Sequence, residues 1–162
     1  SISAVVASTV NSYKRLVPHH EAPTRVVWGL GNRSVMVRVP YYGGKINRIE
    51  YRHPDPSMNP YLAFAVIAMS VVDGISARKT PPQPVADVAY ELEGVKETPK
   101  HLGEALKYFT ESNIAGRLPS QLVKAYVKLK EAEWESYSAK YSWEKTWNTI
   151  TDWEYQQYLY TV

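Results

Sequence analysis

The hydrophobic pattern of the chain changes at Asn59-Pro60, and this change constrains the fold more than any other feature. Before it, β-branched or alternating runs separated by glycine-rich turns predict strands over residues 24–28, 34–39 and 48–51. After it, the apolar residues recur at helical spacing. We therefore expect an α+β fold, with a partial antiparallel sheet followed by helices.

Helix signals are clear in the second part. Asn59 is a suitable N-cap and Pro60 suits the first turn of a helix, which we expect to end at Gly74. This segment is apolar on nearly every side, so the sequence predicts a helix buried behind the sheet. Two further helices are predicted over residues 101–111 and 119–140.

Composition excludes several classes of protein. Hydrophobic residues make up 44% of the chain and charged residues 22%, as in ordinary folded domains. The absence of cysteine excludes disulfides and thiolate metal sites and is compatible with a cytoplasmic enzyme. The longest apolar run, residues 61–72, is shorter than the roughly 20 residues that cross a bilayer, so no membrane anchor is expected. The aromatic residues between 134 and 160 are typical of a core or a subunit interface.

Positive charge is concentrated between residues 11 and 52. This window holds eight of the 19 Lys and Arg residues but only two of the 16 acidic residues, Glu21 and Glu50. Such a concentration attracts an anionic partner, and the predominance of arginine favours bidentate recognition of carboxylate or phosphate. We do not expect nucleic acid, because the aromatic side chains that would stack on bases lie at the other end of the chain.

A charged row lies within this window. Arg48, Glu50 and Arg52 would share one face of a strand, whereas Ile49 and Tyr51 would point the other way, into a core. A carboxylate between two guanidinium groups suits a site that holds a metal together with anionic ligands. A row of salt bridges on a solvated sheet face is the alternative.

Five motifs follow one another in order around this row. They are Asn11-Ser12-Tyr13-Lys14-Arg15-Leu16-Val17-Pro18, Glu21-Ala22-Pro23, Asn32-Arg33-Ser34 with Arg38-Val39-Pro40, Arg48-Ile49-Glu50-Tyr51-Arg52, and Pro54-Asp55-Pro56 with Asn59-Pro60-Tyr61-Leu62-Ala63. The series resembles the second half of the glutamine synthetase catalytic domain. The resemblance is dense over residues 11–75 and weaker towards the C-terminus.

The resemblance implies an ATP-dependent ligase. Enzymes of this family phosphorylate the γ-carboxylate of L-glutamate, and ammonia then displaces phosphate to give L-glutamine. Arg15 and Arg52 match arginines that bind the substrate glutamate. Glu21 matches the carboxylate of a mobile flap that closes over glutamate and helps to deprotonate ammonium. The resemblance marks two residues as catalytic, Glu21 and Arg33.

The resemblance also implies a nucleotide and metal site. Arg33, Arg38 and Lys45 match residues that contact the phosphates of ATP, and Arg48 is expected to support the same phosphates. Glu50 matches a carboxylate ligand of the divalent metal ions, Mg²⁺ or Mn²⁺. Phosphoryl transfer depends mainly on such cations around the phosphate oxygens, so these residue types suit the chemistry.

Three departures from the family pattern bear on the acceptor. His19-His20 stand where the family usually has a glycine, and Gly31 replaces a common basic residue. Trp28-Gly29 looks like the variant found in relatives that join glutamate to polyamines or other amines. Ammonia remains the first expectation because Glu21 is retained. A γ-glutamyl–amine ligase is the second, and a non-enzymatic interaction or structural domain is the third.

The resemblance further implies that much of the enzyme lies elsewhere. The family's other metal ligands, most of its nucleotide pocket and its N-terminal domain precede the matching segment. We therefore expect residues 1–162 to be the C-terminal part of a catalytic domain, strand-rich over 1–56 and mainly helical over 57–162. Alone, this part is expected to be inactive. The full-length form is expected to be a cytoplasmic homo-oligomer, a dodecamer of two hexameric rings.

Several residues are given ordinary structural interpretations. His19-His20 are expected in a surface loop, and His53 and His101 are assigned no chemistry. Tyr90 lies where some bacterial family members carry an adenylylated tyrosine, but a structural tyrosine is the better interpretation. An isolated chain would expose a sheet edge and one apolar face, so we expect it to self-associate.

Overall fold

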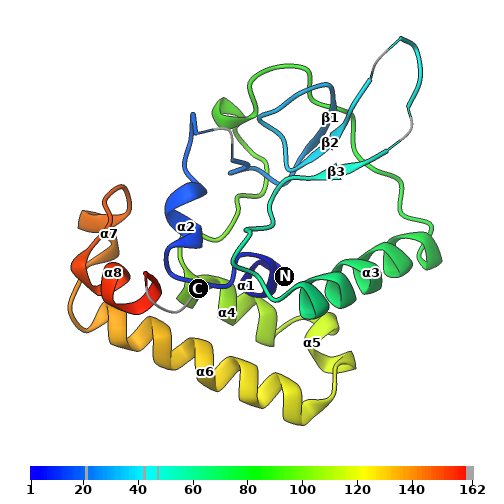
Figure 1. The fold of residues 1–162 in the computed structure, drawn as a ribbon. Coiled ribbons are helices and arrows are strands. Elements are labelled where there is room, and N and C mark those ends of the chain that lie inside the picture. Colours follow the sequence, from blue (N-terminus) through cyan, green and yellow to red (C-terminus); the bar gives the residue numbers. More distant parts are fainter. Residues whose placement is uncertain (21, 42, 47, 160–162) are drawn as a thin grey trace.

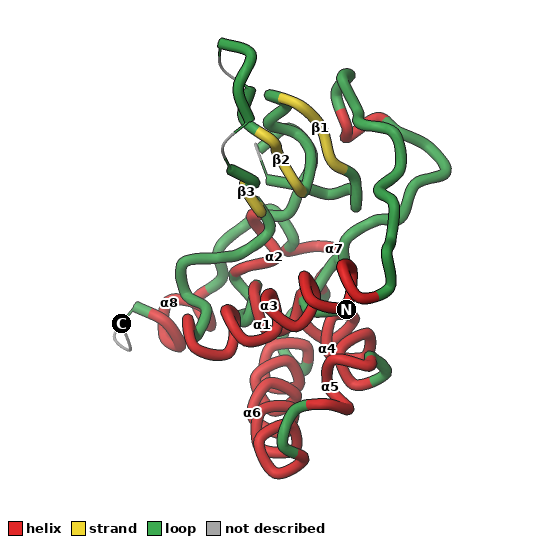
Figure 2. Tube along the Cα trace, turned by 90° about the vertical axis from the view of Figure 1, so that its right-hand side faces the viewer, coloured by secondary structure: helices red, strands yellow, loops and turns green. Residues whose placement is uncertain are grey.

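A small sheet with long loops lies on one side of a helical region. The structure is a computed structural model that describes residues 1–20, 22–41, 43–46 and 48–159. Figure 1 shows the strands and loops above and most of the helices below, and Figure 2 shows the same division after a quarter turn. The strands precede the long helices, as predicted, but two short helices that were not predicted, Ser3–Val6 and Ser12–Arg15, come before the sheet.

The sheet has three short strands and mixed directions. They are β1 (Trp28–Leu30), β2 (Val37–Val39) and β3 (Glu50–Tyr51), in the order β1-β2-β3. β1 and β2 run parallel, whereas β2 and β3 run antiparallel. The prediction of antiparallel strands is confirmed for the second pair and wrong for the first.

The parallel pairing follows from the loop over residues 31–36. This loop returns the chain to the start of β1, where the backbone N–H of Val37 donates to the carbonyl of Val27 at 3.2 Å. Asn32 fixes the loop, because its side-chain oxygen accepts the backbone N–H of residue 34 at 2.9 Å. A chain that re-enters the sheet at this end must run parallel to β1.

Helix α3 (Pro60–Ser76) begins as predicted. The side-chain oxygen of Asn59 accepts the backbone N–H groups of Tyr61 and Leu62 at 3.0 and 3.2 Å. The helix does not end at Gly74, because one interior glycine costs only about 1 kcal/mol relative to alanine. The expected end was therefore two residues too early.

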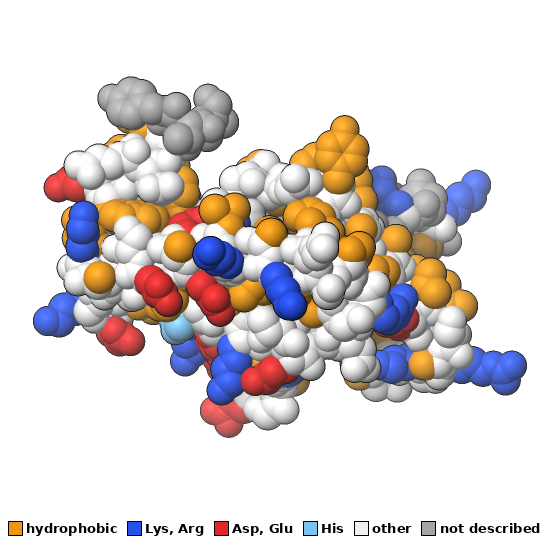
Figure 3. All heavy atoms as spheres, turned by 90° about the horizontal axis from the view of Figure 1, so that it is seen from below, with side chains coloured by type: hydrophobic (Ala, Val, Ile, Leu, Met, Phe, Trp, Pro, Cys, Tyr) orange, Lys and Arg blue, Asp and Glu red, His pale blue; other side chains and the backbone are white. Residues whose placement is uncertain are grey.

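The prediction that α3 is buried on nearly every side is wrong for this chain. Only Ala63 and Val66 are buried, and they face α1 (Ser3–Val6) and α5 (Asn113–Arg117). Tyr61 and Ile75 are 84% and 73% exposed. Seen from the helical side, exposed hydrophobic side chains interrupt the charged surface (Figure 3).

The other helices pack around the N-terminal segment. They are α2 (Ser12–Arg15), α4 (Leu102–Thr110), α6 (Ser120–Ser138), α7 (Trp143–Thr146) and α8 (Asp152–Tyr158), with a single 3₁₀ turn at Ala89–Glu91 in the described part of the chain. The two helices predicted over 101–111 and 119–140 are confirmed to within two residues at each end. No helix in the described part of the chain combines the length and apolar character needed to cross a membrane.

One main core joins both ends of the described chain. Its buried side chains come from every described α-helix except α7, and include Val6, Tyr13, Leu102, Phe109, Tyr137 and Trp153. The aromatic rings near the C-terminus pack on one another, with 5.3 Å between the ring centroids of Tyr137 and Trp153. A core role is therefore confirmed for Tyr137 and Trp153, whereas Trp147 and Tyr155 in the same tail are exposed.

Candidate active site

A carboxylate lies between two guanidinium groups at the β2–β3 edge of the sheet. The strand register places Arg38 opposite Glu50. Nη1 of Arg38 lies 3.1 Å from Oε2 of Glu50, and Nη1 of Arg52 lies 2.7 Å from Oε1. The hydrogen bond from Arg52 and the charges of both arginines hold the pKa of Glu50 below its usual range. The site is therefore built around an ionised carboxylate.

The cluster differs from the expected row in one member. Because β3 contains only Glu50 and Tyr51, strand alternation does not reach Arg48, which is exposed. Ile49 is 71% exposed, so the prediction that it points into a core is wrong. Tyr51 does pack against the main core, as predicted.

The neighbour that the sequence interpretation missed is Arg38. It was assigned to ATP phosphates but was not placed beside Glu50. The signal was available, because residues 34–39 and 48–51 are consecutive predicted strands. Pairing them antiparallel brings position 38 opposite position 50.

Arg15 lies at the end of α2 and is held by the chain that follows β3. Its Nη2 donates to the carbonyl oxygens of His53 at 2.6 Å and Pro54 at 3.1 Å. Its Nε lies 3.8 Å from a carboxylate oxygen of Asp55. Burial lowers the pKa of Arg15; Asp55 opposes this shift and the neighbouring charge of Arg52 adds to it. The two predicted glutamate-binding arginines, Arg15 and Arg52, are therefore electrostatic neighbours.

The remaining basic residues of the predicted site lie in loops. Arg33 is exposed in the loop between β1 and β2, and Lys45 and Arg48 are exposed in the connection between β2 and β3. The structure does not bring these three residues into the cluster around Glu50. Glu21, the predicted flap carboxylate, lies outside the described residues.

The loop before position 21 keeps a glycine-like backbone. His19 has a φ of +66° although it is not a glycine. A non-glycine residue in this left-handed region costs roughly 1–2 kcal/mol. Both His19 and His20 are exposed, which confirms the surface-loop interpretation. Replacement of the family glycine has therefore not removed the positive φ.

The described residues do not form a complete metal site by themselves. Among the residues that the structure describes, no group of three or more His, Cys, Asp or Glu side chains is placed to hold a metal ion. Glu50 offers carboxylate oxygens of the kind that Mg²⁺ and Mn²⁺ prefer, so it suits one position in a coordination shell. The described residues therefore fit one ligand of a divalent cation and not a whole site.

Two other histidines have structural surroundings. His101 accepts the backbone N–H of Glu104 through Nδ1 at 3.2 Å, and its ring stacks on Trp134 with 4.4 Å between centroids. His53 is fully buried, and neither of its ring nitrogens has a hydrogen-bond partner. Tyr90 lies against the ring of His19, with 5.1 Å between centroids.

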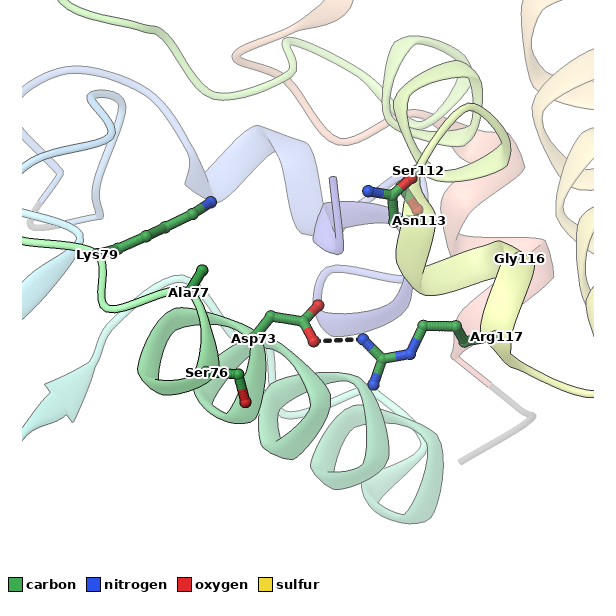
Figure 4. A pocket seen from close by; sticks show the side chains of 8 residues that line it. All are labelled: Asp73, Ser76, Ala77, Lys79, Ser112, Asn113, Gly116 and Arg117. Carbon is green, nitrogen blue, oxygen red and sulfur yellow. Dashed lines mark hydrogen bonds and ion pairs between the residues drawn. The ribbon is translucent and has the colours of Figure 1, made fainter.

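A hollow between α3 and α5 contains none of the predicted site residues. Figure 4 shows the polar side chains around it, with Asp73 of α3 paired to Arg117 of α5. Both partners of this ion pair are more than one-third exposed, so the pair contributes little to stability. We assign no ligand to this hollow.

The fold and the cluster together define the class of this protein. It has an arginine-rich cluster suited to an anion at the edge of a small sheet, and helices back the sheet. The family model described as the glutamine synthetase catalytic domain matches residues 1–158. The chain belongs to the glutamine synthetase family, and the resemblance inferred from the five motifs is confirmed.

Relatives of known name agree with this assignment. The chain is 40% identical to glutamine synthetase of Pyrococcus abyssi over 99% of its own length, and 38% identical to that of Thermotoga maritima over 99%. It spans only 39% and 36% of the length of these two curated relatives.

Solved structures with similar folds carry the name GmaS. The structure titled "Apo GmaS without ligand" matches 98% of this chain with a TM-score of 0.74 and 33% sequence identity. The structure titled "GmaS/ADP complex-Conformation 1" matches the same share with a TM-score of 0.75 and 33% identity. The chain covers 35% and 36% of those two chains, respectively. The glutamine synthetase catalytic-domain fold is therefore confirmed.

Proposed function

We propose that this chain supplies the glutamate- and phosphate-binding arginines of an ATP-dependent glutamate–ammonia ligase. The enzyme would join ammonia to L-glutamate through γ-glutamyl phosphate to give L-glutamine. The observation that carries the proposal is the cluster of Arg38, Glu50 and Arg52, with Arg15 beside it. Family membership alone would not require this chain to retain those charges in contact.

Arg15 and Arg52 would bind the substrate glutamate. A guanidinium group recognises a carboxylate through paired, charge-assisted hydrogen bonds. Arg15 is preorganised by its bonds to two backbone carbonyls, so little side-chain entropy is lost when the substrate arrives. Glu21 would close over glutamate and accept a proton from ammonium.

Four basic residues would neutralise charge on ATP and on the transferred phosphoryl group. Arg38 contacts Glu50, whereas Arg33, Lys45 and Arg48 lie exposed in the loops on either side of β2 and would have to reach the phosphates from there. Glu50 would provide one ligand to Mg²⁺ or Mn²⁺, which neutralises phosphate charge when it is bound. Arg33 would act on the phosphoryl group during transfer.

Ammonia is the preferred acceptor, and a larger amine is the second candidate. The Trp28 indole N–H donates to the carbonyl of Pro82 at 2.7 Å. This bond gives Trp28 a structural role, because it anchors the connector over residues 77–88, between α3 and the 3₁₀ turn. Trp28-Gly29 is therefore a weaker argument for an amine acceptor. Gly31, with a φ of +64°, replaces a basic residue and remains the feature that favours the second candidate.

The active unit would be longer than this chain. The relatives' lengths support a polypeptide in which other segments complete the metal and nucleotide sites, so residues 1–162 would be inactive alone. Residues 1–56 would form the active-site part and residues 57–162 the helical support. We propose a cytoplasmic homo-oligomer built from hexameric rings. A non-enzymatic interaction domain is the remaining alternative.

The test is release of ADP by a full-length polypeptide that contains this segment. With Mg²⁺ or Mn²⁺, ATP and L-glutamate, we expect ammonium to support turnover better than a panel of alkylamines and polyamines. Arg52→Lys should raise the KM for glutamate by at least about tenfold, because lysine cannot reproduce a bidentate contact. Arg25→Lys, in an ion pair away from the cluster, is the matched control.

Each outcome distinguishes one alternative. Preference for a larger amine would replace ammonia as the acceptor and leave the arginine roles in place. Absence of glutamate-dependent ADP release with every amine would contradict the enzymatic proposal and favour an interaction domain.

A further inference from the structure

A buried ion pair joins the N-terminal segment to the last helix. Nζ of Lys14 lies 2.5 Å from Oε2 of Glu154, and the two side chains are only 6% and 1% exposed. The other carboxylate oxygen of Glu154 accepts the Asn11 side-chain N–H at 2.9 Å. The backbone N–H of Thr151 donates to Oε2, also at 2.9 Å. Both oxygens are therefore fully engaged.

The ammonium group of Lys14 is enclosed as well. It lies 5.4 Å from the ring centroid of Tyr137 and 6.0 Å from that of Trp143, distances at which the faces of aromatic rings attract a cation. It also donates to the backbone carbonyl of Thr149. The ammonium group of Lys14 therefore lies beside two aromatic rings on the helical side of the molecule.

Such a pair fixes geometry more than it adds stability. Burying two charges costs several kcal/mol per ion, and well-packed apolar residues often serve stability as well or better. Burial opposes ionisation of Glu154, but hydrogen bonds from Lys14, Asn11 and Thr151 lower its pKa. Glu154 therefore stays ionised at neutral pH, and its hydrogen bonds fix one arrangement of Lys14.

That arrangement bears on Arg15, which follows Lys14 directly. Helix α2 has four residues and no side-chain cap at its N-terminus, so it is too short to be rigid by itself. Its direction is set by what holds its side chains. Glu154 holds Lys14 and Asn11, whereas Arg15 is held separately by the carbonyls of His53 and Pro54.

A second contact holds the same segment from two helices, through Glu133 of α6 and Tyr158 of α8. The backbone N–H of Val10 donates to Oε1 of Glu133 at 3.0 Å and to the hydroxyl of Tyr158 at 3.1 Å. The Tyr158 hydroxyl also donates to Oε1 of Glu133, at 2.5 Å. Two neighbouring points of residues 10–14 are therefore tied to α8, the last helix.

We propose that Glu154 is a positioning residue for Arg15, acting through Lys14 and Asn11. The last helix then forms part of the scaffold of the glutamate site, although it lies about 140 residues away in sequence and touches no substrate in this scheme. The inference rests on the proposed role of Arg15 in binding glutamate. The proposal predicts that substitution of Glu154 weakens the binding of glutamate and not of ATP.

The experiment uses the full-length polypeptide and steady-state ADP release. Glu154→Gln should raise the KM for glutamate about tenfold, with the KM for ATP within about twofold of wild type and a smaller change in kcat. Glu144→Gln, an exposed carboxylate on α7, is the matched control and should change neither constant.

A double variant separates positioning from stability. Lys14→Met with Glu154→Leu removes both buried charges, so its thermal midpoint should return towards that of wild type. The KM for glutamate should nevertheless stay about tenfold high, because the contacts of Glu154 with Lys14 and Asn11 are then lost and the contact at Val10 alone remains. This variant also allows a test if Glu154→Gln fails to fold.

The outcomes are distinct. A KM for glutamate that recovers together with the thermal midpoint would overturn positioning and leave a purely structural pair. If the wild-type enzyme turns over and both variants keep its KM values, this inference is overturned and the proposed function is not. A wild type without glutamate-dependent ADP release would overturn the inference together with the proposed function.

Discussion

Arg38 and Glu50 face each other across β2 and β3, with 3.1 Å between Nη1 and Oε2. Arg52 reaches the other oxygen of the same carboxylate at 2.7 Å. Glu50 thereby keeps two guanidinium groups close together that would otherwise repel each other. Both guanidinium groups are already directed at the Glu50 carboxylate before an anionic substrate arrives, so the cluster is preorganised for an anion.

Glu50→Gln tests this arrangement. The amide keeps the shape but removes the negative charge, so the two arginines repel each other and one metal ligand is weakened. We expect ADP release by the full-length polypeptide to fall at least about 100-fold, the scale on which loss of one preorganised electrostatic group reduces turnover. Steady-state rates over a range of Mg²⁺ concentrations measure this effect.

The control for this variant is Glu97→Gln. Glu97 also pairs with an arginine, Arg25, at 2.8 Å, but is 49% exposed. It should retain wild-type turnover. A Glu50→Gln enzyme with wild-type rates at every Mg²⁺ concentration would show that the cluster is a solvated salt-bridge row, the alternative that the sequence left open.

The sequence was informative where local chemistry decides structure. Asn59 caps α3 because its side-chain oxygen can reach two backbone N–H groups, which is a property of neighbouring residues. The family and the fold followed from five short motifs. Glu50 and Arg52 were correctly placed together because they lie two residues apart in an extended chain.

The sequence was less informative where distant segments decide. The direction of β1 relative to β2 depends on how the loop over residues 31–36 is held, and Arg38 joins Glu50 only through strand pairing. The burial of α3 depends on what packs against each of its sides. The Lys14–Glu154 pair joins residues 140 positions apart, and no local pattern signals it.

Gly29→Ala should destabilise the chain. A Cβ at this position of β1 would clash with the backbone carbonyl of Val85, in the connector that bonds to Trp28. Because backbone cannot rotate away like a side chain, we expect a loss of about 1–3 kcal/mol in the free energy of unfolding. Urea denaturation followed by tryptophan fluorescence measures it.

Gly74→Ala provides the opposite expectation. Nothing lies within 4 Å of a Cβ at Gly74, which is inside α3. Alanine should therefore stabilise the chain by about 0.5–1 kcal/mol. Equal effects of the two substitutions would mean that Val85 does not approach β1 as closely as the structure has it.

His53 should make stability depend on pH. Burial lowers the pKa of this histidine to about 4, and the neighbouring charge of Arg15 adds to the shift. The unfolded chain takes up the proton near pH 6.5, before the folded chain does. Stability is therefore fully present above about pH 6.5 and is lost as the pH falls towards 4, by about 3 kcal/mol in all.

His53→Phe checks the cause of this dependence. The substitution keeps a ring beside Tyr51, whose centroid lies 6.2 Å from that of His53, and removes the titrating group. The free energy of unfolding between pH 4 and 7 should then change by about 3 kcal/mol less than in the wild type. Exposed His20→Phe is the control, and an equal flattening in both variants would contradict the assignment to His53.

The exposed face of α3 should make the isolated chain self-associate. Tyr61, Phe64, Val71 and Ile75 recur at helical spacing and are 84%, 65%, 55% and 73% exposed. A contiguous apolar face of this kind is removed from water when two copies meet. Phe64→Lys with Ile75→Lys should therefore give a monomer at concentrations where the wild-type chain forms larger species, as measured by light scattering after gel filtration.

Gln121→Lys with Ser138→Lys adds the same charge to exposed positions of α6 and should still associate, since it leaves the apolar face intact. A monodisperse wild-type monomer at about 100 μM, or equal dispersal by both double variants, would show that this face does not drive association.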